Sequence, residues 1–124
     1  MKPIASAALL AALALTATAA RAAPAPAPAP DPQAVARGQV LFNQVGCYQC
    51  HGYVGQGSTA SGATLAPNPA PLAYYQAYVR NPRGQMPPYS AAILSDAQLA
   101  DIHAYLRSIP VGRPAAEIPL LSGR

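Results

Sequence analysis

Apolar residues recur at helical spacing in three separate segments of the chain, and this pattern predicts its secondary structure. The segments cover residues 32–45, residues 71–80 and a stretch that opens at Ser95. The predicted inward positions are, in order, Val35, Val40, Leu41, Phe42 and Val45, then Leu72, Tyr75 and Val79, and finally Leu99, Ile102, Tyr105, Leu106 and Ile109. No segment alternates apolar and polar residues as a half-buried strand does. The pattern therefore predicts an all-α domain with three main helices.

Residues with known capping preferences bound these predicted helices. Asp31 is a good N-cap, and the proline after it suits a first helical turn. Gly46 is a stop signal for the first helix, and Pro82 disfavours helical conformation in the residue before it. Ser95 and Gln98, three positions apart, have the pattern of a capping box at the start of the last helix. Local signals and apolar pattern thus agree on where the helices begin and end.

The two ends of the chain differ in composition from this helical region. Residues 1–22 are typical of a cleaved secretory signal peptide, with Lys2 at the start, an uncharged run over 4–20 and the small residues Ala20 and Ala22 before the cleavage point. An uncleaved membrane anchor is the alternative, but this run is mostly Ala and Thr and is short for a span of about 20 residues. Residues 23–30 alternate Ala and Pro, which predicts an extended linker. We therefore expect a signal peptide at 1–22, a linker at 23–30, a domain at 31–110 and a proline-containing tail at 111–124, in a protein exported to the periplasm.

The charge of the chain limits its partners. The full sequence carries a formal net charge of +4. Removal of residues 1–22 takes away Lys2 and Arg21, which leaves six arginines, no lysine and four acidic residues, a net charge of +2. The arginines are scattered and form no basic run, so a nucleic-acid partner is not expected. A modestly basic rim would favour docking to an acidic redox protein.

The strongest chemical signal is the motif formed by Cys47, Cys50 and His51. The spacing C-x-x-C-H is the attachment signature of c-type haem, in which both thiols become thioethers and the histidine ligates the iron. Positions i, i+3 and i+4 of a helical turn share a face, so all three side chains can point the same way. Three short helices bury little apolar surface by themselves, and a covalently held porphyrin would supply the missing apolar mass.

Other uses of the two cysteines fit the sequence less well. A structural disulfide across two residues would close a very small loop and restrict the unfolded chain little. A thiol–disulfide oxidoreductase would place a strand of a βαβ unit before the motif, whereas a helix is predicted there. A structural zinc site would lack a fourth ligand, because only one histidine follows the pair.

The second axial ligand of the iron is narrowed by elimination. After removal of residues 1–22 the chain contains one methionine, Met86, and one histidine besides His51, namely His103. The sixth ligand is therefore one of these two residues, water or a less usual group. Met86 precedes two prolines that fix the backbone of its loop, which suits a thioether held in one place. His103 falls on the predicted outer side of the last helix, where a solvated surface histidine is the simpler interpretation. Met86 is therefore the expected ligand.

Residues 52–62 contain four glycines with Ser and Thr between them and predict a loop. One interpretation is a flexible connector. The other is backbone that wraps closely against the porphyrin edge, where side chains would not fit.

Three features carry a resemblance to a known family: a haem motif that follows one helix, a lone methionine on a proline-containing loop, and a closing helix that reads Ile-His-Ala-Tyr-Leu from Ile102. The chain resembles the class I, small mono-haem cytochromes c of bacteria over about residues 31–110. The resemblance implies the cytochrome c fold, with Gly38 and Phe42 of the first helix packed across Ile102 and Tyr105 of the last. This crossing would explain a glycine in the middle of a helix.

The resemblance also implies roles for residues outside the motif. It implies that the carbonyl group of Pro67 accepts a hydrogen bond from His51, with Ala66 as the alternative. It implies that Arg80 and Arg83 bind the haem propionates, although ordinary surface charge is an equal alternative for each. Tyr89 would hydrogen-bond a propionate or simply pack. The lysine ring of mitochondrial relatives has no counterpart here.

The function expected from these features is electron transfer by one His/Met-ligated haem c, without enzymatic activity of its own. The protein would act as a mobile carrier or as the cytochrome subunit of a dehydrogenase or membrane oxidase. The alternative is a haem enzyme or gas sensor with an open iron position. The tail at 111–124 would be either frayed or an arm that packs on the domain or on a partner.

Overall fold

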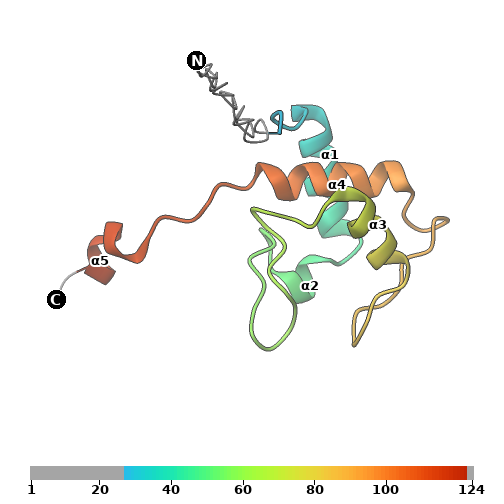
Figure 1. The fold of residues 1–124 in the computed structure, drawn as a ribbon. Coiled ribbons are helices and arrows are strands. Elements are labelled where there is room, and N and C mark those ends of the chain that lie inside the picture. The colour runs from blue at the N-terminus through green and yellow to red at the C-terminus, as the bar shows by residue number, and fades with distance from the viewer. Residues whose placement is uncertain (1–26, 123–124) are drawn as a thin grey trace, which may run out of the picture.

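The computed structural model describes residues 27–122, so the expected signal peptide and the first half of the linker lie outside the described residues. The elements in chain order are α1 (Pro32–Gln44), α2 (Tyr48–His51), α3 (Leu72–Arg80), α4 (Asp96–Ser108), the 3-10 turn η1 (Ala115–Glu117) and α5 (Pro119–Ser122) (Figure 1). Within residues 27–122 there is no strand, only an isolated bridge between Ser58 and Gly62. The all-α fold class is confirmed.

The helix ends follow the capping signals in the sequence. The carboxylate of Asp31 accepts hydrogen bonds from the backbone N–H groups of Gln33 and Ala34 at the start of α1. At the start of α4, Ser95 and Gln98 form both hydrogen bonds of a capping box. Such caps satisfy backbone donors that the first helical turn leaves without partners. The predicted boundaries of α1, α3 and α4 agree with the structure to within one residue.

α1 and α4 cross in close contact and form the frame of the domain (Figure 1). Gly38 is buried at the crossing, and a Cβ atom there would overlap the carbonyl group of Asp101. Beside it the guanidinium group of Arg37 donates to both carboxylate oxygens of Asp101, at 2.7 and 2.8 Å. The rings of Phe42 and Tyr105 pack at a tilt with their centroids 5.7 Å apart. The mid-helix glycine therefore allows the backbones to meet.

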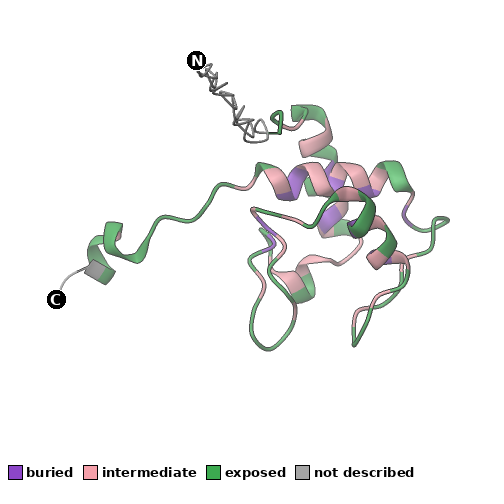
Figure 2. Cartoon of the chain, viewed as in Figure 1, coloured by how far each residue is buried: buried purple, intermediate pink, exposed green. Residues whose placement is uncertain are grey.

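The core lies where α1, α3 and α4 meet, and its buried apolar members are Phe42, Ala66, Tyr75, Val79, Leu94, Leu99, Ile102, Tyr105 and Leu106 (Figure 2). One predicted inward position is wrong. Val40 is 54% exposed, because it lies two positions from the fully buried Phe42 and thus about 200° around the helix from it. The apolar face of α1 is narrower than the sequence pattern predicted.

The two flanking segments differ in their contacts with the domain. The carbonyl group of Pro28, near the end of the Ala-Pro segment, accepts a hydrogen bond of 2.7 Å from Arg107 on α4. The tail leads away from the domain to α5, where Leu120 is 95% exposed (Figure 1). Packing of the described part of the tail on its own domain is therefore not observed. Among residues 27–122, no helix combines the length and apolar character needed to cross a membrane.

Candidate haem-binding site

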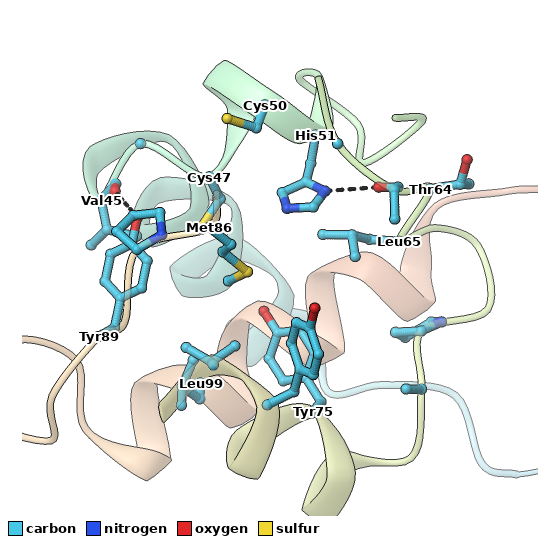
Figure 3. A pocket seen from close by; sticks show the side chains of 18 of the residues that line it. Val45, Cys47, Cys50, His51, Thr64, Leu65, Tyr75, Met86, Tyr89 and Leu99 are labelled. Atoms are coloured by element: carbon cyan, nitrogen blue, oxygen red, sulfur yellow. Dashed lines mark hydrogen bonds between the residues drawn. The ribbon is translucent and has the colours of Figure 1, made fainter. Parts of the chain in front are cut away.

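All four expected haem-attachment and iron-ligand residues line one cavity of about 710 Å³ (Figure 3). Cys47, Cys50 and His51 reach it from the start and body of α2, and Met86 reaches it from the loop between α3 and α4. A pocket of about 300–1,000 Å³ is typical of sites that bury a small molecule or cofactor. The floor is apolar and is formed by buried side chains, namely Tyr75, Val79, Leu94 and Leu99.

His51 is held in one orientation by a backbone carbonyl group. Its Nδ1 atom lies 2.7 Å from the carbonyl oxygen of Ala63. A carbonyl oxygen only accepts hydrogen bonds, so Nδ1 carries the proton and donates it, which leaves the lone pair of the neutral ring on Nε2. Figure 3 shows the imidazole extending into the cavity. Histidines that ligate metals are oriented in this way by a partner on their other nitrogen.

The partner of His51 differs from the expected one. Neither Pro67 nor Ala66 accepts the hydrogen bond, and Pro67 does not line the cavity. The reason is the way the loop is fastened: the N–H groups of Leu65 and Ala66 both donate to Gly55, at 2.8 and 3.1 Å. The chain before these bonds, at Ala63, is therefore the part that lies beside the imidazole.

The glycine-rich loop packs closely on the haem motif. The hydroxyl group of Ser61 donates to the carbonyl oxygen of Cys50 at 2.7 Å, and the N–H of Gly57 donates to that of His51 at 2.8 Å. A Cβ atom on Gly62 would lie 2.8 Å from the carbonyl oxygen of Cys50 and 3.0 Å from Nδ1 of His51. The loop is therefore closely packed backbone and not a flexible connector. Its observed contacts are with the haem motif, whereas the expected contacts were with the porphyrin edge. The loop positions Ala63 by these bonds.

The two thiols are free, and their surroundings do not suit thiol redox catalysis. Burial raises the pKa of Cys47 to about 11, whereas reactive thiols of oxidoreductases have lowered pKa values. The element before the motif is α1 and not a strand. Within residues 27–122, no three His, Cys, Asp or Glu side chains are grouped so as to hold a metal ion. Two free thiols beside an oriented imidazole fit the attachment of haem c.

Met86 is half-buried, and its loop is tied to the helices through Tyr89. The N–H of Tyr89 donates to Val79 at 3.1 Å, and its hydroxyl group donates to the carbonyl oxygen of Val45 at 2.9 Å. The carbonyl oxygen of Tyr89 in turn accepts a bond of 2.8 Å from Arg80. Figure 3 shows the thioether pointing into the cavity. These bonds and the two prolines between Met86 and Tyr89 restrict where the sulfur can lie.

The two arginines expected at the propionates have different surroundings. Arg80 does not line the cavity, because its guanidinium group is bound to the carbonyl group of Tyr89 and to the carboxylate of Asp96. The contact of Arg80 with a propionate stays a prediction, and in this structure its guanidinium group is engaged away from the cavity. Arg83 does line the cavity, and its side chain has no hydrogen-bonding partner among residues 27–122. Arg83 remains the candidate for a propionate contact, whereas Tyr89 uses its hydroxyl group on the protein backbone.

His103 does not line the cavity. Its Nε2 atom donates to the carbonyl oxygen of Ala70 at 2.9 Å, and its ring packs against that of Tyr75 with centroids 5.6 Å apart. It is half-buried, so the expectation of a solvated surface histidine is wrong, although its place away from the other ligands agrees with a residue that does not bind iron.

Two site residues were missed in the sequence. Ala63 acts through its backbone carbonyl group, for which a sequence holds no signal. Tyr75 was expected to face inward, but its hydroxyl group has no partner among residues 27–122, and burial raises the pKa of its phenol. Its inward position on the apolar face of α3 was the sequence feature that could have indicated a residue lining the cavity.

The all-α fold, together with Cys47, Cys50, His51 and Met86 around one cavity, defines a c-type cytochrome domain. Residues 33–106 match the family model described as "Cytochrome C oxidase, cbb3-type, subunit III". The match covers more than half of the chain, which therefore belongs to this family. No curated protein and no solved structure matches the chain.

Proposed function

We propose that this protein is an electron carrier in which Cys47 and Cys50 would hold one haem c covalently and His51 and Met86 would ligate its iron. The observation that carries the proposal is the convergence of these four side chains on one cavity, with Nδ1 of His51 bound to Ala63. When bound there, haem c supplies a one-electron Fe(III)/Fe(II) couple.

The residues of the chain contribute orientation and exclusion of water. The carbonyl group of Ala63 keeps the Nε2 lone pair of His51 directed into the cavity. The bonds of Tyr89 hold the loop that presents Met86. A thioether ligand raises the reduction potential, and ligands fixed in advance rearrange little when the redox state changes. The apolar floor at Val79, Leu94 and Leu99 keeps water from one side of the site.

A haem enzyme or gas sensor would use an open iron position and polar groups beside it. Among the described lining residues there is no carboxylate and no second histidine, and a thioether is available as a ligand. A thioether ligand would close the iron position that such a protein keeps open, which supports an electron carrier.

Export by the signal peptide at 1–22 would place the carrier in the periplasm, where c-type haem would be attached after translocation. The description of the family names an oxidase subunit. We therefore propose a redox protein of a respiratory chain, such as a dehydrogenase or membrane oxidase, as partner, with the protein acting as a mobile carrier or as a cytochrome subunit.

The test is production of the full chain in a host that supplies haem-maturation factors, followed by mass spectrometry and optical spectroscopy of both redox states. The proposal predicts one haem per chain, export of the chain and a reversible low-spin spectrum. His51→Ala should abolish the low-spin spectrum, whereas the matched change His103→Ala should leave it intact. An exported chain without haem, or binding of carbon monoxide by the reduced protein at neutral pH, would contradict the proposal.

A further inference from the structure

We infer that the mouth of the haem cavity is a docking surface for a redox protein whose own contact patch is uncharged. This inference rests on the proposed electron-transfer function, because it concerns the surface through which the electron would leave. The expectation of a modestly basic rim is not what the structure shows.

The exposed residues around the cavity define this mouth. They are Gln49, Cys50, Ser61, Ala63, Thr64, Asn68, Ala70, Tyr74, Arg83, Gln85 and Pro87. Arg83 is the one member with a formal charge, and among the described residues no carboxylate lines the cavity. The mouth therefore lacks the ring of like charges that steers an oppositely charged partner.

The other arginines of the domain are engaged away from the mouth. Arg37 is paired with Asp101 across α1 and α4, and Arg80 is paired with Asp96. Arg107 donates to the carbonyl group of Pro28. None of these three arginines lines the cavity. The charges of Arg37 and Arg80 are thus neutralised in ion pairs outside the mouth, and Arg107 keeps its charge but lies outside the cavity lining.

An exposed aromatic pair supplies apolar contact area at the mouth. Tyr74 is 62% exposed, and its ring stacks on that of Tyr78 with centroids 6.0 Å apart. Both residues line the cavity. Tyrosine is enriched at protein interfaces because it offers a large, rigid surface with one polar end. Together with Ala63 and Pro87, this pair gives a partner apolar area beside the site of electron exit.

The rate of electron transfer tests the inference, because charged docking is screened by salt and apolar docking is not. A second copy of this chain itself presents an uncharged mouth, so electron self-exchange between ferrous and ferric holoprotein, measured by NMR line broadening, needs no known partner. We expect the rate constant to change by less than about threefold between about 0.01 M and 0.5 M ionic strength, because only Arg83 and the propionates carry charge at the mouth. A larger change, or self-exchange too slow to broaden the resonances at any salt concentration, would overturn the inference.

Two double variants distinguish the effect of charge at the mouth from the effect of the net charge of the protein. The double variant Asn68→Lys with Gln85→Lys places two cations at the mouth, whereas Gln33→Lys with Gln39→Lys places them on the exposed side of α1. Both variants have the same net charge. Only the first should slow self-exchange at low salt, by about tenfold, with recovery at high salt. Equal behaviour of the two variants would show that net charge controls the encounter and would overturn the inference.

A second pair tests the apolar contact. Tyr74→Ser removes an exposed ring at the mouth, and Tyr53→Ser removes a ring that is similarly exposed (67%) and stacked on Tyr48, but lies outside the cavity lining. Tyr74→Ser should slow self-exchange about fivefold at every salt concentration, while Tyr53→Ser leaves the rate within about twofold. An equal effect of both changes, or none from Tyr74→Ser, would contradict the apolar role. The optical spectrum of each variant shows separately whether haem and ligands are intact, so failure of the proposed function is distinguishable from failure of this inference.

Discussion

Gly38 lies directly against the backbone carbonyl group of Asp101, so that α1 and α4 meet backbone to backbone. This contact sets how closely the two helices approach. Leu99 of α4 and Leu94, which precedes that helix, belong to the same buried cluster as Phe42 of α1 and form part of the cavity floor. The helix crossing and the haem site are therefore parts of the same packing arrangement.

Gly38→Ala should destabilise the holoprotein by about 1–3 kcal/mol, because the added methyl group meets backbone that has no rotamer with which to move aside. Denaturant unfolding followed by circular dichroism measures this free energy. Gly112→Ala is the control, since nothing lies within 4 Å of a Cβ atom at that position. Helix propensity alone would stabilise Gly38→Ala by about 1 kcal/mol, so an unchanged or increased stability would contradict the close crossing.

Arg80→Ala should loosen the loop that carries Met86. It removes the donor to the carbonyl group of Tyr89 and the partner of Asp96, a loss of about 1.5–3 kcal/mol for bonds made by a charged, half-buried group. We expect the signal of methionine ligation to disappear at a lower urea concentration than in the parent protein. Arg37→Ala is the matched control: it breaks an ion pair of an exposed arginine, which solvent screens, and it lies away from the loop. Loss of methionine ligation at the same urea concentration in both variants would show that Arg80 does not anchor the loop.

Stability should fall at alkaline pH because of Tyr105. Burial raises the pKa of its phenol in the folded state, and its hydroxyl group donates to Tyr53 at 2.9 Å. Below the unfolded pKa of about 10 both states are protonated and stability does not depend on this group. Above that pH the unfolded state loses the proton first, so stability decreases as pH rises toward the folded pKa.

Tyr105→Phe checks this account in two ways. At pH 7 it should cost about 0.5–1.5 kcal/mol through the lost hydrogen bond. Above about pH 10, its free energy of unfolding should decrease less steeply with pH than that of the parent protein, because one titrating group is gone. Parallel pH profiles for the two proteins would assign the alkaline loss of stability to other groups.

Much of the fold could be predicted because its signals are local. The caps at Asp31 and Ser95 and the apolar spacing of α3 and α4 depend on residues a few positions apart, and the structure agrees with them. Val40 was placed wrongly because its chemistry suits a core while its angular position on α1 does not.

The candidate site could be predicted only where side-chain identity carries the chemistry. Cys47, Cys50, His51 and Met86 were found in this way, and the structure brings them to one cavity. The partner of His51 could not be predicted, because any residue has a carbonyl group and only the loop bonds to Gly55 select Ala63.

Roles that depend on competing partners could not be predicted either. The sequence does not show that Asp96 and Tyr89 come close enough to engage Arg80, or that Ala70 binds His103. Such contacts between distant residues are set by tertiary packing. These contacts place Arg80 against the loop that carries Met86 and make His103 half-buried.

Ligation by His51 and Met86 is tested most directly by the sulfur-to-ferric-iron charge-transfer band of the oxidised holoprotein, measured in the parent protein and in Met86→Ala and His103→Ala. We expect the band in the parent protein and in His103→Ala but not in Met86→Ala, with the haem still covalently attached in all three. A band that persists in Met86→Ala, or that is lost in His103→Ala, would contradict the assignment of His51 and Met86 as the ligand pair.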